Sequence, residues 1–241
     1  TRKNSIAGLV ETISQKPELS SLLLGAAAQE SNNAQGNLER IYSQLVAIEM
    51  WQKMKEFLPQ EVRNPKVLIT PLTKIKTEHD ASSMVIDLIV SKKRLNLNGA
   101  VMRFINHHDV RTIVQEILIR QDYYFESDND TPTIIDCGAN FGLGLYYYKK
   151  LYPNSRIIAF EPGKRSFKTL KHNVDIAGWK DITIHQAAVG AKESVVSFFD
   201  PEEMPMGGTL TSRLNELEYE GFSYDVNVKR LSEHITNTVD F

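Results

Sequence analysis

Two acidic residues and a glycine turn stand where nucleoside-binding chemistry would need them. Asp136 and the turn 138–142 follow a short apolar run, and Glu161 ends a second such run. A glycine turn between a strand and a helix lets a ligand approach the backbone, because no Cβ intervenes. An acid at the end of the next strand can accept hydrogen bonds from both ribose hydroxyls. The spacing therefore predicts a cofactor that contains a nucleoside.

The turn favours S-adenosylmethionine over a dinucleotide. The dinucleotide pattern G-x-G-x-x-G, started at Gly138, needs glycines where this chain has Asn140 and Leu143. Asp136 would repel a pyrophosphate but attract an ammonium group. S-adenosylmethionine has an ammonium group and no phosphate, so the pattern D-x-G-x-N-x-G suits it better than NAD.

An alternation of strands and helices after residue 132 would position these residues. This order predicts an α/β fold with a parallel, Rossmann-like sheet and right-handed crossovers. In such sheets ligands bind at the carboxyl ends of the strands, where the acids and the glycine turn lie. We expect strands at 133–137, 156–160 and 182–189, an extension at 195–199, and helices at 145–151 and 164–177.

The first part of the chain differs in pattern. Residues 1–60 are predicted to be helical apart from a polar loop at 29–36, and 67–70, 84–90 and 101–105 are predicted to be short strands. The turn 96–99 would let the strand 101–105 pair back as a hairpin. Asp109 would be the N-cap of the next helix. We therefore expect an N-terminal helical and small-strand region at 1–108, followed by the Rossmann-like core at 109–241.

One predicted helix has an apolar stripe along its length. The stripe must be covered, either by the same chain or by a second copy, and a homo-oligomer is one of the two options. Covering within the chain, by the strands expected between 67 and 105, is the favoured interpretation. The stripe consists of Leu38, Ile41, Leu45, Ile48, Trp51, Met54 and Leu58.

The ordered motifs resemble those of the FkbM-type methyltransferases, a class I S-adenosylmethionine-dependent group. The resemblance covers about residues 109–241. It implies that Asp136, Gly138, Asn140 and Gly142 surround the methionine end of the cofactor. The motifs are Asp-Cys-Gly-Ala-Asn-Phe-Gly at 136–142, Ile-Ala-Phe-Glu-Pro at 158–162 and Gln-Ala-Ala-Val-Gly at 186–190.

The same resemblance implies the remaining roles. Glu161 would hold the ribose, and Gln186 and Ala187 would lie near the adenine. Family members mostly methylate hydroxyl groups on sugars, polyketides and other natural products, so the expected partner is a small-molecule or glycan acceptor.

The family continues with an Asp-x-Glu-Gly motif after a fourth strand. Here the fourth strand is expected to begin at 238–241, where the sequence stops. The core is therefore expected to be truncated at this strand, and no catalytic residue or general base is assigned.

Several residues have a competing structural interpretation. Glu161 could be a solvated acid at a strand end, and Asp136 a structural turn acid, although cofactor binding is favoured for both. Cys137 is expected to be a small buried hydrophobe. His107 and His108 are conceivable bases near the acceptor, but a loop before the Asp109 cap is preferred.

Two longer stretches of the sequence also have both a functional and a structural interpretation. The basic excess at 149–172 could attract an anionic substrate, although a solvated helix face explains it more simply. The loop 200–212, rich in glycine, proline and methionine, is a candidate binding loop or a segment without function.

Composition excludes several classes of protein. The 28 Lys and Arg against 30 Asp and Glu give a net charge of −2, which disfavours nucleic-acid binding. No apolar stretch reaches the roughly 20 residues of a membrane span. The single cysteine excludes an internal disulfide and favours a reducing, cytoplasmic location, and no metal site is expected. A non-catalytic binding module and an NAD-dependent oxidoreductase remain the alternatives to a methyltransferase.

Overall fold

The computed structural model describes residues 34–72, 74–202, 208, 220–235 and 238–241. The chain divides into two compact units. The first comprises the residues up to Ser91 together with Asn96–Gly99, and the second comprises Lys92–Leu95 and Ala100–Phe241. The domain border expected at 108–109 stays a prediction.

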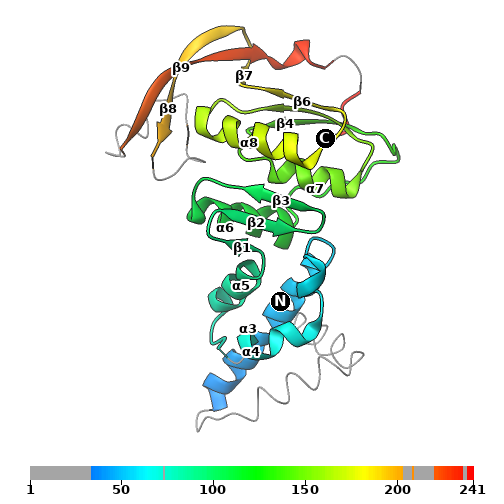
Figure 1. Ribbon diagram of the computed structural model, residues 1–241, viewed down its shortest axis with the longest axis vertical. Coiled ribbons are helices and arrows are strands. Elements are labelled where there is room, and N and C mark those ends of the chain that lie inside the picture. Colours follow the sequence, from blue (N-terminus) through cyan, green and yellow to red (C-terminus); the bar gives the residue numbers. More distant parts are fainter. Residues whose placement is uncertain (1–33, 73, 203–207, 209–219, 236–237) are drawn as a thin grey trace. The chain divides into compact units, whose positions relative to one another are not determined.

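The first unit is mainly helical (Figure 1). Its long helix α3 packs on α5, and Trp51 of α3 donates its indole N–H to the Val62 carbonyl oxygen at 3.0 Å. The elements are α3 (Ala34–Met54), the 3-10 turns η1 (Gln60–Val62) and η2 (Pro65–Leu68), α4 (Ile69–Leu72), α5 (Glu78–Asp87) and the short strand β1 (Val90–Ser91).

From Leu45 to Leu58 the apolar stripe, which runs along α3 and into the turn after it, is buried within the chain. Ile48 is 1% exposed, Trp51 2%, and Met54 and Leu58 0%. Helices pack over it rather than the strands that the sequence predicted. The predicted loop 29–36 is also partly wrong, because α3 already begins at Ala34; residues 1–33 lie outside the described part of the chain.

The strand predicted at 67–70 is helical instead, and so is most of the strand predicted at 84–90, where only Val90 is in a strand. A capping box begins α5: the Thr77 hydroxyl accepts the Asp80 N–H at 3.1 Å, and the Asp80 carboxylate accepts the Thr77 N–H at 2.9 Å. Val85 and Ile86 are then buried on one face of the helix with Ala81. Their β-branched side chains indicated a strand, but capping and packing outweigh that preference.

A parallel sheet forms the centre of the second unit. Strands β4 (Thr133–Cys137), β5 (Arg156–Phe160) and β6 (Ile182–His185) are ordered β4-β5-β6. Ile135 pairs with Ile158, and Ile158 with Thr183. Helices α7 (Leu143–Leu151) and α8 (Lys164–Ala177) make the connections (Figure 1). The predicted α/β fold with a parallel, Rossmann-like sheet is confirmed.

The other edge of β4 is also occupied. The Ile135 N–H donates to the Phe241 carbonyl oxygen, and the Asp240 N–H donates to that of Thr133, both at 2.9 Å. The ring of Phe241 stacks on Phe125 with centroids 4.8 Å apart. Residues 238–241, where the sequence predicted the start of a fourth strand, are not assigned as a strand, but their backbone lies beside β4.

A second sheet follows the first. Strands β7 (Ala188–Gly190), β8 (Ser194–Pro201) and β9 (Gly221–Arg230) are ordered β7-β9-β8, with β7 parallel and β8 antiparallel to β9. The single strand predicted at 182–189 is therefore wrong, because the chain leaves the first sheet after β6. The extension predicted at 195–199 lies within β8, whereas β9 was not predicted.

The segment before β4 supplies shorter elements. They are β2 (Arg94–Leu97), β3 (Ala100–Arg103), α6 (His107–Val114) and the π-helical η3 (Gln115–Ile119). The predicted turn is present, and Gly99 adopts a φ of 79° there. The N-cap of α6 is Asn106, whose side chain accepts the His108 N–H at 2.6 Å. The prediction of Asp109 as the cap is wrong, because Asp109 lies inside the first turn.

Candidate functional site

A cavity of about 200 Å³ opens in the second unit, at the carboxyl ends of β4 and β5. The turn after β4 forms one wall, and Glu161 and Pro162 after β5 form another. Ile113 and Glu116 line it from the helical segment before β4, and Phe198 of β8 also contributes. Asp136, Gly138, Asn140 and Glu161, all predicted site residues, are brought together here.

The turn between β4 and α7 has an unusual backbone. Gly138 has a φ of 101°, Asn140 of 48° and Gly142 of 93°, in a region that favours glycine and tolerates asparagine. The N–H groups of Gly138 and Ala139 both donate to the Phe160 carbonyl oxygen, at 2.8 and 3.0 Å. The turn is thereby attached to the end of β5.

Gly138 and Gly142, the two predicted site glycines, are required at their positions for different structural reasons. A Cβ on Gly138 would meet no atom within 4 Å, so its positive φ is the constraint there. A Cβ on Gly142 would come within 2.8 Å of the Leu170 side chain of α8. Gly142 is also the N-cap of α7. It therefore serves close packing as well as the turn.

Asn173 holds this turn from α8 and was missed by the sequence analysis. It is 2% exposed. Its amide NH₂ donates to the carbonyl oxygens of Phe141 at 2.8 Å and Arg103 at 2.9 Å, and its amide oxygen accepts the Arg103 N–H at 2.8 Å. One side chain thus satisfies three backbone groups.

Asp136 is 8% exposed and borders the cavity. Burial raises the pKa of its carboxyl group to about 7. One carboxylate oxygen lies 2.9 Å from the position that a Cβ would take on Gly144, so only glycine leaves room for it. Within the described part of the chain we find no hydrogen bond to the Asp136 carboxylate.

Glu161 is 7% exposed and is bound to the backbone on both sides. One carboxylate oxygen accepts the Asn140 N–H at 2.8 Å, and the other accepts the Gly163 N–H at 2.7 Å. Burial raises its pKa to about 7, although these two hydrogen bonds act in the opposite direction. The interpretation of Glu161 as a solvated strand-end acid is therefore wrong.

The remaining predicted residues lie elsewhere. Gln186 is exposed, and Ala187 is buried beside Ile158 and Phe160. Neither is among the described residues that line the cavity. Cys137 is exposed, so the prediction of a buried small hydrophobe is wrong.

Three cavity residues came from segments without a recognisable motif. Burial first, and then the negative charges of Asp136 and Glu116, raise the pKa of Tyr123, which lies in the loop before β4. Glu116 belongs to η3, and Phe198 to β8. The only feature of the sequence that could have identified Glu116 as a cavity residue is its position as an acid between the apolar residues Ile113 and Ile117.

The basic stretch 149–172 is partly neutralised by the chain itself. Arg165 forms an ion pair with Asp200 at 2.6 Å, and Lys171 pairs with Asp175 at 2.8 Å. The Lys149 ammonium group donates to the Ser155 carbonyl oxygen at 2.5 Å. Of the loop predicted at 200–212, residues 203–207 and 209–212 lie outside the described part of the chain.

Two features, a cluster of metal-binding side chains and a membrane-spanning helix, are absent from the described residues. No group of three or more His, Cys, Asp or Glu side chains is arranged there to hold a metal ion. Among the helices described, none has the length and apolar character needed to cross a membrane.

Comparisons with known proteins point to methyltransferases. No family model matches the chain. "Methyltransferase 1" of Beauveria bassiana (strain ARSEF 2860) is 28% identical over 141 residues, which are 53% of this chain and 57% of that protein. "Methyltransferase sdnD" of Sordaria araneosa is 35% identical over 66 residues, 27% of this chain and 26% of that one.

A crystal structure of methyltransferase FkbM from Methylobacillus flagellatus KT is also similar, with 14% identity and a TM-score of 0.31. The match covers 83% of this chain and 42% of that chain. The chain thus spans less than two thirds of the length of each of these proteins. Its similarity to methyltransferases, predicted from the motifs, is confirmed by the two curated relatives.

Proposed function

We propose that the chain contains the S-adenosylmethionine-binding part of an FkbM-type methyltransferase. The observation that supports this most directly is Asp136, a buried carboxylate at the cavity without a hydrogen-bonding partner in the described structure. Ionising such a group is costly unless a cation or a hydrogen-bond donor approaches it. A ligand with an ammonium group would compensate that cost.

The cavity fits such a cofactor in two further respects. The open space beside Gly138 leaves room for a ligand against the backbone. Each oxygen of Glu161 accepts one N–H, and a carboxylate oxygen has a second lone pair that can accept a ribose hydroxyl. We assign the methionine end to Asp136 with the turn 138–142, and the ribose to Glu161. Gln186 and Ala187 are proposed near the adenine on the family resemblance alone.

The proposed reaction is methyl transfer to an acceptor. The bound cofactor would supply an electrophilic methyl group, and this chain would bind and orient it, because positioning is a large part of such catalysis. The proposed acceptor is a hydroxyl on a sugar, a polyketide or another natural product. Residues 1–108 are proposed to form the acceptor site or oligomer contacts, with the cofactor bound by 109–241 in the cytoplasm.

An NAD-dependent oxidoreductase is disfavoured by the same acid. A pyrophosphate near Asp136 would add repulsion to the cost of burial. Asn140 and Leu143 also replace two glycines of the dinucleotide pattern.

Thermal unfolding of the 241-residue chain with different ligands tests the proposal. A ligand at about 100 times its dissociation constant stabilises a protein by about 2.7 kcal/mol. S-adenosylmethionine and S-adenosylhomocysteine should raise the unfolding temperature, whereas NAD should leave it unchanged. Stabilisation by NAD alone would contradict the proposal.

A further inference from the structure

Helix α8 begins without a cap from its own N-cap residue. Gly163 is the N-cap and has no side chain to accept a hydrogen bond, so the first N–H groups need acceptors from elsewhere. Two other residues provide them. Glu161 accepts the Gly163 N–H at 2.7 Å, and the Tyr224 hydroxyl oxygen of β9 accepts the Lys164 N–H at 2.7 Å.

The Tyr224 hydroxyl is oriented by Asp200 of β8. It donates to one carboxylate oxygen of Asp200 at 2.9 Å. Because its proton is committed to Asp200, its lone pairs are available to the Lys164 N–H. The Lys164 ammonium group also lies 4.1 Å from the centroid of the Tyr224 ring. The tyrosine is thus held at both its hydroxyl group and its ring.

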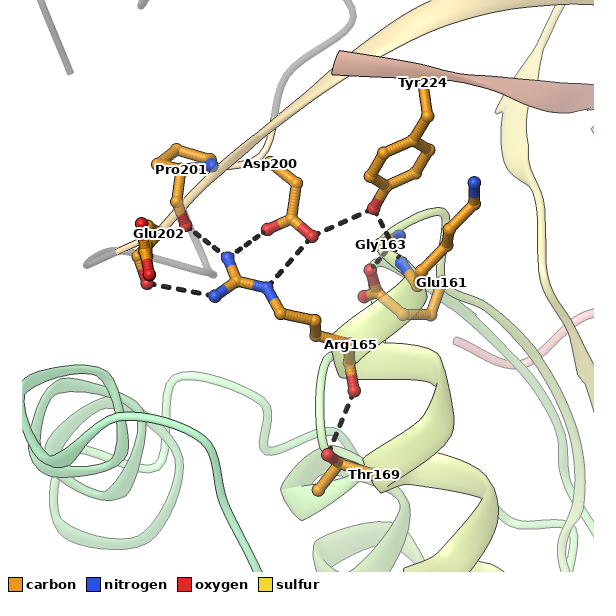
Figure 2. Close-up of polar contacts among 9 residues, drawn as sticks. Glu161, Gly163, Arg165, Thr169, Asp200, Pro201, Glu202 and Tyr224 are labelled. Carbon is orange, nitrogen blue, oxygen red and sulfur yellow. Dashed lines mark hydrogen bonds and ion pairs between the residues drawn. The ribbon is translucent and has the colours of Figure 1, made fainter. Parts of the chain in front are cut away.

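Asp200 is fixed in turn by Arg165. Asp200 is 2% exposed, and the guanidinium group binds both of its oxygens, at 2.6 and 3.2 Å. Such bidentate pairs have a defined geometry as well as a favourable energy. Arg165 also donates to the carbonyl oxygens of Pro201 and Glu202 (Figure 2). The start of α8 is therefore tied to β8 and β9 by charged and neutral hydrogen bonds.

These contacts continue to the cavity through Glu161. One of its oxygens binds Gly163, next to the Lys164 N–H that Tyr224 caps, and the other binds Asn140 of the glycine turn. We propose that Tyr224, held by Asp200 and Arg165, is a positioning residue that fixes Glu161 for a nucleoside in the cavity. The nucleoside itself rests on the proposed function, whereas the positioning of Glu161 does not require it.

The first test measures amide hydrogen exchange in the ligand-free chain. Tyr224→Phe removes the cap, so the Gly163 and Asn140 amides that bind Glu161 should exchange about three- to ten-fold faster, as expected for the loss of one hydrogen bond. Tyr152→Phe is the matched control. It also removes a hydroxyl that accepts a backbone N–H, that of Ser127 at 2.9 Å, and should leave both amides unchanged.

The second test is a double-mutant cycle on S-adenosylhomocysteine affinity. Tyr224→Phe should weaken binding about three- to ten-fold in the wild-type background and have almost no effect in a Glu161→Gln background. Loss of fold stability alone would lower affinity equally in both.

The outcomes separate the two proposals. Unchanged exchange of the Asn140 and Gly163 amides, or an equal loss of affinity in both backgrounds, would overturn the positioning role. If the wild-type chain bound no S-adenosylhomocysteine, the proposed function would fail, and the exchange measurement would still decide the role of Tyr224.

Discussion

Burial shifts the pKa of two carboxyl groups, those of Asp136 and Glu161, to near neutral pH. The pKa of each is raised to about 7, well above the value of an exposed carboxyl group. A raised pKa in the folded state favours folding at low pH, and this contribution is lost as the pH rises through the folded value. The ligand-free chain should therefore lose stability as the pH rises from about 4, the ordinary carboxyl value, to about 7, the folded value, by an amount on the order of a few kcal/mol.

Denaturant unfolding across this pH range checks the sign. In the Asp136→Asn variant the unfolding free energy should decrease less as the pH rises, because the amide has no ionisable proton to lose. Asp175→Asn, at an exposed position of α8, should keep the wild-type slope. A wild-type stability that rises with pH over this interval would contradict the assignment.

The same ionisation should couple to cofactor binding. If the ligand ammonium group needs a charged Asp136, affinity for S-adenosylhomocysteine should increase as the pH rises through about 7. Calorimetry in buffers of different ionisation enthalpy should detect proton release on binding. Asp136→Asn should bind more weakly and abolish the release, and a wild-type affinity independent of pH would count against the role of Asp136.

Glu161 is expected to contribute to affinity directly. Glu161→Ala should weaken S-adenosylhomocysteine binding by about 1.5–3 kcal/mol, the range for hydrogen bonds to charged groups. Part of this loss comes from the Asn140 and Gly163 N–H groups that Glu161 binds. Titration of the purified variant checks the value. An affinity equal to wild type would mean that Glu161 has only a structural role.

At the scale of elements, α8 supports the glycine turn through Asn173. Asn173→Ala would leave the Phe141 carbonyl and both backbone groups of Arg103 without this partner. An unsatisfied buried group costs about 1–3 kcal/mol, and the two Arg103 hydrogen bonds are only partly buried, so we expect a loss of about 2–4 kcal/mol in unfolding free energy. Ile176→Ala on the same helix removes a side chain that is 63% exposed and should cost far less. Equal losses in the two variants would contradict this account.

The elements around the site could be predicted because local signals agree there. Strands β4 and β5 are apolar runs with an acid at or just after their ends, and α8 ends before Gly178, its C-cap, which adopts a left-handed conformation with φ 63°. The last part of α5 was predicted to be a strand because of its β-branched residues, and the Thr77 cap that begins this helix was not recognised. Strand β9 was not predicted, although its apolar residues alternate with polar ones and Val226 and Val228 are buried between exposed or half-buried neighbours.

Within the site, the sequence predicted residues that stand at the ends of strands but not residues that act through long-range hydrogen bonds. Asp136 and Glu161 were found from their places after strands. Asn173, Tyr224 and Asp200 were not, because their partners lie far away in sequence, 70 residues for Asn173 with Arg103 and 60 for Tyr224 with Lys164. No local pattern reports such pairs.

At the scale of the whole chain, the cavity lies entirely in the second unit. Cofactor should therefore slow hydrogen exchange in peptides from β4, α7 and β5 and leave those from α3 and α5 unchanged. Exchange measured by mass spectrometry on the 241-residue chain, with and without S-adenosylhomocysteine, checks this. Comparable protection of α3 would contradict the assignment of the cofactor to residues 109–241.

The central claim is that this cavity binds S-adenosylmethionine and its demethylated product. Calorimetric titration of the chain at neutral pH with S-adenosylhomocysteine, and separately with NAD, tests it most directly. We predict micromolar binding of S-adenosylhomocysteine, about −8 kcal/mol, and no heat of binding with NAD. Binding of NAD in preference to S-adenosylhomocysteine would contradict the account.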